Sequence, residues 1–498
     1  MDQQDTGNSE RQLPPRILLI AAAIIFLPGF LIGPIHEDFG WMSWVKLADF
    51  FHNTLLSPLG NRYYRPLATL VPYKLADLLP GGFLFWRAGQ ILGVAFTAWR
   101  LWLLLQRLAP FSRWATIGTL LWLAEYGRPF GVYYFNATDY LLLNLSLVFF
   151  LGSLLDRRWA GATLWLLMGL GAKEQAVTFP LIGMLLVPLW WHAASARSFF
   201  CLSIAVCSGF LVWRLNAAGN LSAILAPAHA PEQLFGFPLD LSMKSIVRSY
   251  QFLFKESFWL TGTPFLTAQA SVSVSRIFGT FLVALCLCAL WRFSHFILVI
   301  KYLASSMIFF FPVAVLGSYV RIELINGHLI LSLILMQQLA SANQSLQRLI
   351  RANVTFYGAV LILLTAMTMN SLHFKKLFRF TSESYFTLIQ ETSKAAAPCP
   401  NEAGLVVTGL SAIGPALRVF HAHALDWGLP HFRFHYPDLA TTREPPPAAA
   451  PQIRLIPTAS LGGIIRLRAE LLDPHGVCRS PENPNRKPRW EKYPFGVR

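Results

Sequence analysis

Apolar runs long enough to cross a lipid bilayer recur along this chain, and they set the strictest limit on its fold. The first run covers 17–35, and ten more follow at 83–106, 114–126, 138–155, 159–172, 176–191, 199–213, 277–291, 302–318, 327–340 and 354–369. A span needs about 20 apolar residues. Charged types make up only 13% of the 498 residues, against about a quarter in soluble domains. The sequence therefore predicts an all-α polytopic membrane protein with about 11 transmembrane helices, and it excludes a soluble enzyme.

The basic residues favour one orientation in the membrane. With 1–16 in the cytoplasm, the inner pieces carry eleven Lys and Arg, and the short outer pieces carry seven in more residues. Loops that stay inside collect Lys and Arg, so the net charge of +16 indicates anionic lipid or a lipid-linked phosphate as partner, not nucleic acid. We expect a multi-pass protein of a bacterial inner membrane, with a cytoplasmic N-terminus and a periplasmic C-terminal tail.

Composition divides the chain into three parts. These are the polar N-terminus 1–16, the apolar region 17–370 with long outer loops at 36–82 and 214–276, and the tail 371–498. The tail combines Pro-rich segments with short apolar runs, which predicts a small extracytoplasmic domain of α/β type. Cys399 and Cys478 lie in this tail, and they can form a disulfide if the tail faces an oxidising compartment.

Two groups of polar residues follow the first span in the sequence. Glu37 and Asp38 are adjacent carboxylates at an apolar boundary, where like charges raise at least one pKa and so favour a general base. Arg62, Tyr64 and Arg65 lie further along the same outer loop, and an Arg there can hold a phosphate through two hydrogen bonds. The simpler interpretations are the end of a span for the acidic pair and a juxtamembrane anchor for the Arg and Tyr residues.

More polar residues flank the other predicted outer loops. These are Asp139, Lys173, Glu174, Arg321 and His328. Charged residues between spans are costly unless they are exposed or used, although each is also compatible with a simple turn. Because all of them map to one side of the membrane, we expect a site at the outer interface, whereas a pore distributes its charges with depth.

Motifs for nucleotides and metals are not found. The sequence has no P-loop, no DxD and no zinc spacing, and the histidines of the tail at positions 421, 423, 431 and 435 are interpreted as surface residues. We therefore expect no metal and no cofactor.

The order of these motifs resembles that of the GT-C membrane glycosyltransferases. The acidic pair, the sequence YRPL at 64–67, an Asp-Tyr-Leu-Leu run at 139–142 and Lys173-Glu174 with Pro180 after it are similar to the glycosyltransferase family 39 or protein O-mannosyltransferase branch and its TMTC-like relatives. The resemblance covers about 15–370. No TPR-like array follows, so the chain departs from the TMTC architecture.

The resemblance implies roles for individual residues. Either Glu37 or Asp38 is the catalytic base, and the resemblance does not decide between the two. Arg65, Lys173 and Arg321 bind the donor phosphate, with His328 in place of an Arg-Tyr pair of relatives, while Arg62, Tyr64, Asp139 and Glu174 support the site. The reaction implied is inverting transfer of a sugar from a polyprenyl phosphate to the hydroxyl of a protein, lipid or glycan.

Three other functions remain open at this point. A transporter or flippase of lipid-linked sugars needs charges near the bilayer midplane, and a ligase or polymerase uses a lipid-diphosphate donor instead. A non-catalytic scaffold would work through its tail, and then Glu37, Asp38 and Arg65 would be dispensable.

Overall fold

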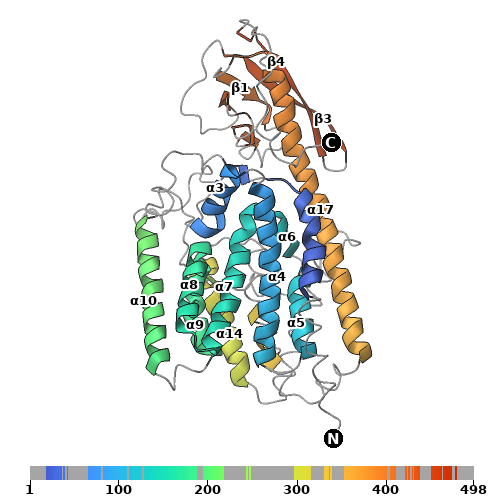
Figure 1. The fold of residues 1–498 in the computed structure, drawn as a ribbon. Coiled ribbons are helices and arrows are strands. Elements are labelled where there is room, and N and C mark those ends of the chain that lie inside the picture. The colour runs from blue at the N-terminus through green and yellow to red at the C-terminus, as the bar shows by residue number, and fades with distance from the viewer. Residues whose placement is uncertain are drawn as a thin grey trace.

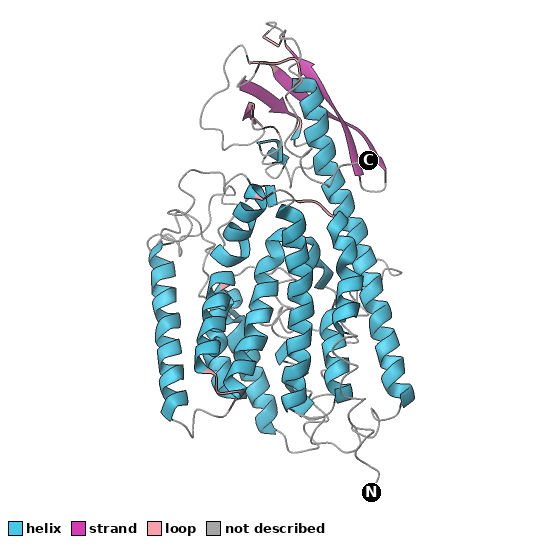
Figure 2. Ribbon diagram, in the orientation of Figure 1, coloured by secondary structure: helices cyan, strands magenta, loops and turns pink. Residues whose placement is uncertain are grey.

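The computed structural model consists of a body of roughly parallel helices with a small sheet domain at one end (Figures 1 and 2). The residues that the structure describes are 18–35, 38, 39, 42, 65–79, 82–108, 112–125, 128–187, 194–217, 243, 244, 246, 247, 296–315, 330, 331, 333–335, 337, 338, 353–400, 404–410, 421, 422, 424–426, 429, 431–437, 450–461, 464–473, 477 and 478.

The helical body begins with a helical run at 18–26 and the 3-10 turn η1 (Leu27–Leu31). Its other elements are the π-turn η3 (Pro66–Leu70), α3 (Val71–Leu78), α4 (Gly82–Leu108), α5 (Ser112–Ala124), α6 (Arg128–Tyr133), η4 (Phe135–Ala137), α7 (Thr138–Leu155), α8 (Trp159–Ala172), η5 (Glu174–Thr178), α9 (Phe179–Leu186), α10 (Ala194–Ala217), α14 (Phe296–Val315) and α17 (Asn353–Ala396).

Four helices of the described part are long and apolar enough to cross a membrane. They are Phe83–Leu108, Thr138–Leu155, Ala194–Trp213 and Val354–Ala396, and the shorter apolar helices are Leu18–Phe30, Trp159–Ala172, Glu174–Leu186 and Ile300–Pro312. The chain is thus a helical membrane protein, and the described residues contain only part of the eleven spans that the sequence predicts. The run 277–291 lies outside the described residues, and 327–340 is described only in short pieces.

Burial separates the central helices from the peripheral ones. In α7, 72% of the apolar window is buried inside the protein, against 28% in α10 and 17% in α17. The outer helices expose large apolar side chains, for example Leu202 on α10 and Ile362 on α17. A helix that is apolar all round belongs either in a core or in lipid, so α7 forms the core of the body and α10 and α17 present their outer faces to the acyl chains.

Helix α17 corrects the prediction for the last span and for the domain boundary. The sequence predicted a span over 354–369 and a separate tail from 371, but α17 continues without a break to Ala396. Figure 1 shows it running from the helical body along the sheet domain. Asn370 donates to the carbonyl of Ala124 at 3.0 Å, and Ser371 donates to that of Ile25 at 2.6 Å. One helix therefore joins both parts, and it still contacts the helical body beyond the predicted boundary, through Phe378 against Tyr134 and Tyr385 against Phe39.

The tail contains a four-stranded mixed sheet in the order β2-β1-β3-β4. The strands are β1 (Gly404–Thr408), β2 (Arg433–His435), β3 (Gln452–Leu461) and β4 (Ile464–Leu472). β1 pairs parallel with β2 and β3, while β3 and β4 form an antiparallel pair. Together with α17, which packs along β4, this is the α/β character expected of the tail.

Two local contacts hold the tail together. Cys399 and Cys478 form the disulfide that the sequence allowed. Tyr436 donates from its hydroxyl to Asp426 at 2.7 Å, and its burial and this carboxylate raise the pKa of Tyr436 above its ordinary value. Gly409 follows β1 with φ +89°, and a Cβ there would collide with the carbonyl oxygen of Leu455. Only glycine tolerates both the positive φ and the lack of space for a Cβ at this position.

Candidate functional site

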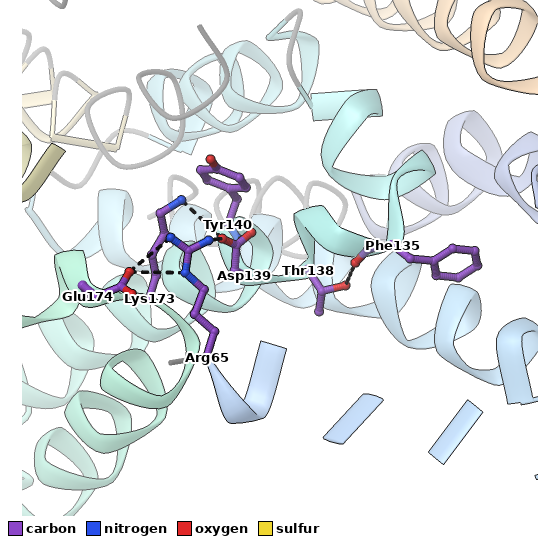
Figure 3. A network of polar contacts seen from close by, with 7 residues as sticks. All are labelled: Arg65, Phe135, Thr138, Asp139, Tyr140, Lys173 and Glu174. Atoms are coloured by element: carbon purple, nitrogen blue, oxygen red, sulfur yellow. Dashed lines mark hydrogen bonds and ion pairs between the residues drawn. The ribbon is translucent and has the colours of Figure 1, made fainter. Parts of the chain in front are cut away.

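Four charged residues from three separate regions of the chain meet in one network (Figure 3). Arg65 directly precedes η3, Asp139 is in the first turn of α7, Lys173 follows α8, and Glu174 opens η5. Helices α7 and α8 are antiparallel neighbours, so the start of one lies beside the end of the other. The structure thus brings together four of the predicted site residues.

Arg65 lies between two carboxylates. Its Nη1 donates to Asp139 Oδ2 at 2.6 Å, and its Nε and Nη2 both lie 3.2 Å from Glu174 Oε2. Asp139 is fully buried, whereas Arg65 and Glu174 keep 12% and 19% of their side chains exposed. The network therefore has a closed side at Asp139 and an accessible side at Arg65 and Glu174.

Lys173 is the second cation of the network. Its Nζ lies 3.3 Å from Asp139 Oδ2 and 3.4 Å from the centre of the Tyr140 ring. Asp139 also accepts the backbone N–H of Tyr140 at Oδ1, at 2.8 Å. Buried charges are tolerated only when they are paired and hydrogen-bonded, and this pairing holds two cations and two carboxylates in fixed positions with no net charge.

Glycines of α8 allow the elements of the network to approach. A Cβ at Gly171 would lie 2.7 Å from Cδ1 and 2.9 Å from Cγ of Leu67, and one at Gly169 would lie 2.9 Å from the Cβ of Ala176. Leu67 is two residues after Arg65, and Ala176 is two residues after Glu174. Small residues let helix backbones come close in membrane proteins, and here they bring η3 and η5 onto the end of α8.

Asp38 is the one member of the predicted catalytic pair that the structure describes. It is fully buried. Its Oδ2 accepts the backbone N–H of Ile35 at 2.9 Å, and its Oδ1 accepts the hydroxyl of Tyr73 on α3. Both carboxylate oxygens are therefore engaged within the protein.

Arg87 is a functional candidate that sequence reasoning missed. It lies near the start of α4, is fully buried and interacts electrostatically with Asp38. Its guanidinium donates to the carbonyls of Val132, Tyr133 and Ile32, and it stacks 3.9 Å from the centre of the Phe135 ring. An ionisable residue inside an apolar span was the available signal, but the run around it was interpreted only as a span.

A row of contacts connects Asp38 with the charged network. The Tyr73 ring packs edge-on against Trp86 at 4.4 Å between centres. Thr138 Oγ1 accepts from Trp86 Nε1 at 3.0 Å and from Gln90 at 2.9 Å, and donates to the carbonyl of Phe135 at 2.7 Å. Thr138 directly precedes Asp139, so this row of contacts runs from Asp38 to the charged network.

The remaining predicted site residues are not placed by the structure. Glu37, Arg62, Tyr64, Arg321 and His328 lie outside the described residues.

One histidine of the tail differs from the sequence interpretation. His421 is buried, not on the surface, with its ring 5.2 Å from that of Tyr385 on α17.

Buried charge is concentrated at one end of the helical body. The buried charged side chains of its described part are Asp38, Arg87, Glu125, Arg128, Asp139 and Lys173. Each lies at or near the beginning or end of its helix, on the side where α3 faces the sheet domain (Figure 1). Glu125 and Arg128 form a separate ion pair of 3.1 Å within this layer.

Two buried amides have hydrogen-bonding groups that the described residues do not satisfy. Both side-chain atoms of Gln175, which follows Glu174, lack a hydrogen-bond partner there, as do those of Asn144 on α7. Buried polar groups are rarely left unsatisfied unless they serve a ligand or an ordered water. Gln175 therefore joins the candidate site.

Comparison of the chain with models of protein families and with curated protein sequences finds no match.

Proposed function

We propose that this chain is an inverting membrane glycosyltransferase that takes its sugar from a polyprenyl phosphate. The observation that carries the proposal is the grouping of charged residues at one end of the helical body, where the buried Asp38, Asp139 and Lys173 lie with the partly exposed Arg65 and Glu174. A site at the membrane edge suits a donor that is anchored in lipid and an acceptor that comes from water. A transporter needs charges at the midplane, and the described helices bury theirs at one end.

An apolar cleft beside η5 supports access for the lipid part of the donor. It holds about 360 Å³ and is lined by Val177 and Thr178 of η5 and by residues of α9, α10 and α14 that are all apolar except Ser208. The cleft begins three residues after Glu174. A polyprenyl chain in this cleft would place its phosphate close to the exposed side of the network.

The engagement of Asp38 within the protein supports the choice of Glu37 as the base in this proposal. Asp38 is fully buried, and both of its oxygens accept hydrogen bonds from the protein, so it is suited to hold the loop and Arg87 in place. In the proposed reaction, the carboxylate of Glu37 takes the proton of the acceptor hydroxyl. That oxygen then forms a bond to the anomeric carbon, and the bond from this carbon to the phosphate oxygen breaks. Polyprenyl phosphate leaves with the electron pair, and the anomeric centre is inverted.

The charge balance of the network limits its part in this step. Arg65 and Lys173 are already neutralised by Asp139 and Glu174, so a leaving phosphate needs an additional cation. Arg321 and His328 are the proposed sources. Arg65 then contributes a fixed, partly exposed guanidinium that orients the phosphate. Preorganised donors of this kind stabilise charge that develops in a transition state.

The proposed orientation places this site outside the cytoplasm. The disulfide between Cys399 and Cys478 supports a tail in an oxidising compartment, and the basic inner loops support a cytoplasmic N-terminus.

The test is release of polyprenyl phosphate from radiolabelled polyprenyl-phosphate sugars by the full chain in membranes. We expect Glu37→Gln to stop release while the protein keeps its thermal stability. Asp38→Asn should lower both the release and the thermal stability, because it removes a buried charge that interacts electrostatically with Arg87. Arg379→Gln changes an exposed ion pair on α17 and serves as the matched control. The proposal is wrong if no donor turns over in a panel of sugars, or if Glu37→Gln behaves like the control.

A further inference from the structure

A second, smaller cavity lies at the opposite end of α9 from the charged network. It holds about 230 Å³ and is lined by the last two residues of α9, one face of α14 and the described helical residues near 331–338. The lining residues are Leu185, Leu186, Lys301, Tyr302, Ser305, Leu331, Leu335 and Gln338. Since α9 begins directly after η5, its far end points away from the site described above.

The cavity contains a cation that nothing in the described part of the chain neutralises. Lys301 lies in the second turn of α14, and no carboxylate among the described residues pairs with it. An ammonium that is half-buried between leucines is costly without a counter-charge. A bound anion in the cavity would supply the counter-charge for Lys301.

A buried hydroxyl next to Lys301 points to the same kind of ligand. Ser305 is one helical turn beyond Lys301 on the same face of α14. It is fully buried, and its Oγ has no hydrogen-bond partner in the described structure. A serine inside a helix usually donates to the carbonyl four residues earlier, and Ser305 does not. A free hydroxyl donor and an ammonium thus line one small cavity.

The chemistry of the lining selects among anions. One ammonium balances one negative charge, which is the charge of a phosphodiester, whereas a phosphomonoester or diphosphate would leave charge uncompensated in apolar surroundings. The volume is below the ~300–1,000 Å³ of pockets for drug-sized ligands, so it suits a head group and not a sugar donor. The four leucines provide apolar contacts for hydrocarbon chains attached to such a phosphodiester.

We propose that this cavity binds the phosphodiester head group of an anionic phospholipid from the leaflet opposite the charged network. Lys301 supplies the counter-charge and Ser305 donates a hydrogen bond to a phosphate oxygen, while the acyl chains pass along the leucines. In the orientation proposed above, this is the cytoplasmic leaflet, where anionic lipid attracts basic residues. The inference is independent of the glycosyltransferase proposal, since it uses none of the same residues.

The test measures retention of lipid by the full chain in native mass spectrometry. Protein is reconstituted with phosphatidylglycerol, with phosphatidylcholine, or with glycerophosphoglycerol, which has the head group but no acyl chains. We expect phosphatidylglycerol to be retained at least about tenfold more than phosphatidylcholine. Lys301→Gln and Ser305→Ala should each reduce this retention about tenfold, and Lys301→Arg should keep it.

Matched controls separate binding from folding. Ser306→Ala removes a neighbouring hydroxyl that is equally buried and also without a partner in the described structure but does not line the cavity, and Lys375→Gln removes a lysine of α17. Both should retain lipid like the unmodified chain. The proposal is overturned if Lys301→Gln and Ser305→Ala retain phosphatidylglycerol as the controls do, if phosphatidylcholine is retained equally, or if the soluble diester binds as tightly as the lipid.

Discussion

At the scale of single residues, the charged side chains of the site are held in place by ion pairs with each other. Asp139 is fully buried and contacts Arg65, Lys173 and the backbone of Tyr140. Removing one partner of a buried ion pair leaves the other uncompensated, which costs about 3–5 kcal/mol. The residues of the network are therefore coupled, and their substitutions should not be additive.

Arg65→Ala should lower the free energy of unfolding by about 3 kcal/mol, at the lower end of the range for buried pairs because Arg65 is partly exposed. The double variant Arg65→Ala/Asp139→Ala should lose clearly less than the sum of the two single changes, because it removes both members of the pair. Chemical unfolding of the protein in detergent micelles measures the three values. Additive losses would show that the two side chains do not interact.

Tyr73→Phe removes the hydroxyl that donates to Asp38 and leaves a buried carboxylate oxygen without this partner. We expect a loss of about 1–3 kcal/mol in stability and a smaller loss of sugar transfer than for Glu37→Gln. The unfolding midpoint and the transfer assay are measured on the same preparation. Tyr357→Phe, on an exposed side chain of α17, is the control, and an equal effect of both changes would contradict this role of Tyr73.

At the scale of elements, close approach at the end of α8 decides where Arg65 lies. The turn η3 packs onto Gly171 through Leu67, and η5 packs onto Gly169 through Ala176. These contacts leave no room for a Cβ, so the backbone geometry and not the charges alone brings the three elements together.

Gly171→Val should displace η3 and reduce sugar transfer by about tenfold or more, since an error of about 1 Å in a positioned group can cost a hundredfold in rate. Leu67→Ala in the same chain should restore part of the activity by making room for the new side chain. Gly93→Ala, where an added Cβ meets nothing within 4 Å, should have no effect. Failure of the Leu67 change to restore activity would argue against the steric explanation.

At the scale of the whole molecule, α17 and the disulfide connect the sheet domain with the charged layer. Phe39, next to Asp38, packs against Tyr385 of α17 at 4.9 Å between ring centres, and Tyr385 packs against His421 of the tail. The disulfide joins residues 79 positions apart, from the end of α17 to a point beyond β4. The sheet domain is thereby held beside the loop that carries the acidic pair.

Cys399→Ser/Cys478→Ser should destabilise the tail by about 2–4 kcal/mol, because the open chain gains conformational freedom when it unfolds. Limited proteolysis should then cut the tail first and leave the helical body intact. Cys201→Ser changes a free, exposed cysteine of α10 and should leave the cleavage pattern as it is. Equal protease resistance with and without the disulfide would contradict its role in holding the tail.

The sequence alone determined the membrane class and most of the helices. α7 and α8 occur at the predicted residues 138–155 and 159–172, because hydrophobicity over a span length is a local property. It also indicated a tail with α/β character, its disulfide and the four residues Arg65, Asp139, Lys173 and Glu174 that meet in the network. The length of α17 was not predictable in this way, since its second half packs against the sheet and against residues far away in the sequence.

Only the tertiary structure decided how the cluster is arranged. The sequence placed Arg65 and Lys173 as cations for a phosphate, but in space each is paired with Asp139, and Arg65 also with Glu174. The burial of Asp38 and its electrostatic interaction with Arg87 depend on elements that are far apart along the chain. Periodicity and composition report what each segment faces on average, whereas pairing of charges depends on which segments meet, and close packing at residues such as Gly171 determines that.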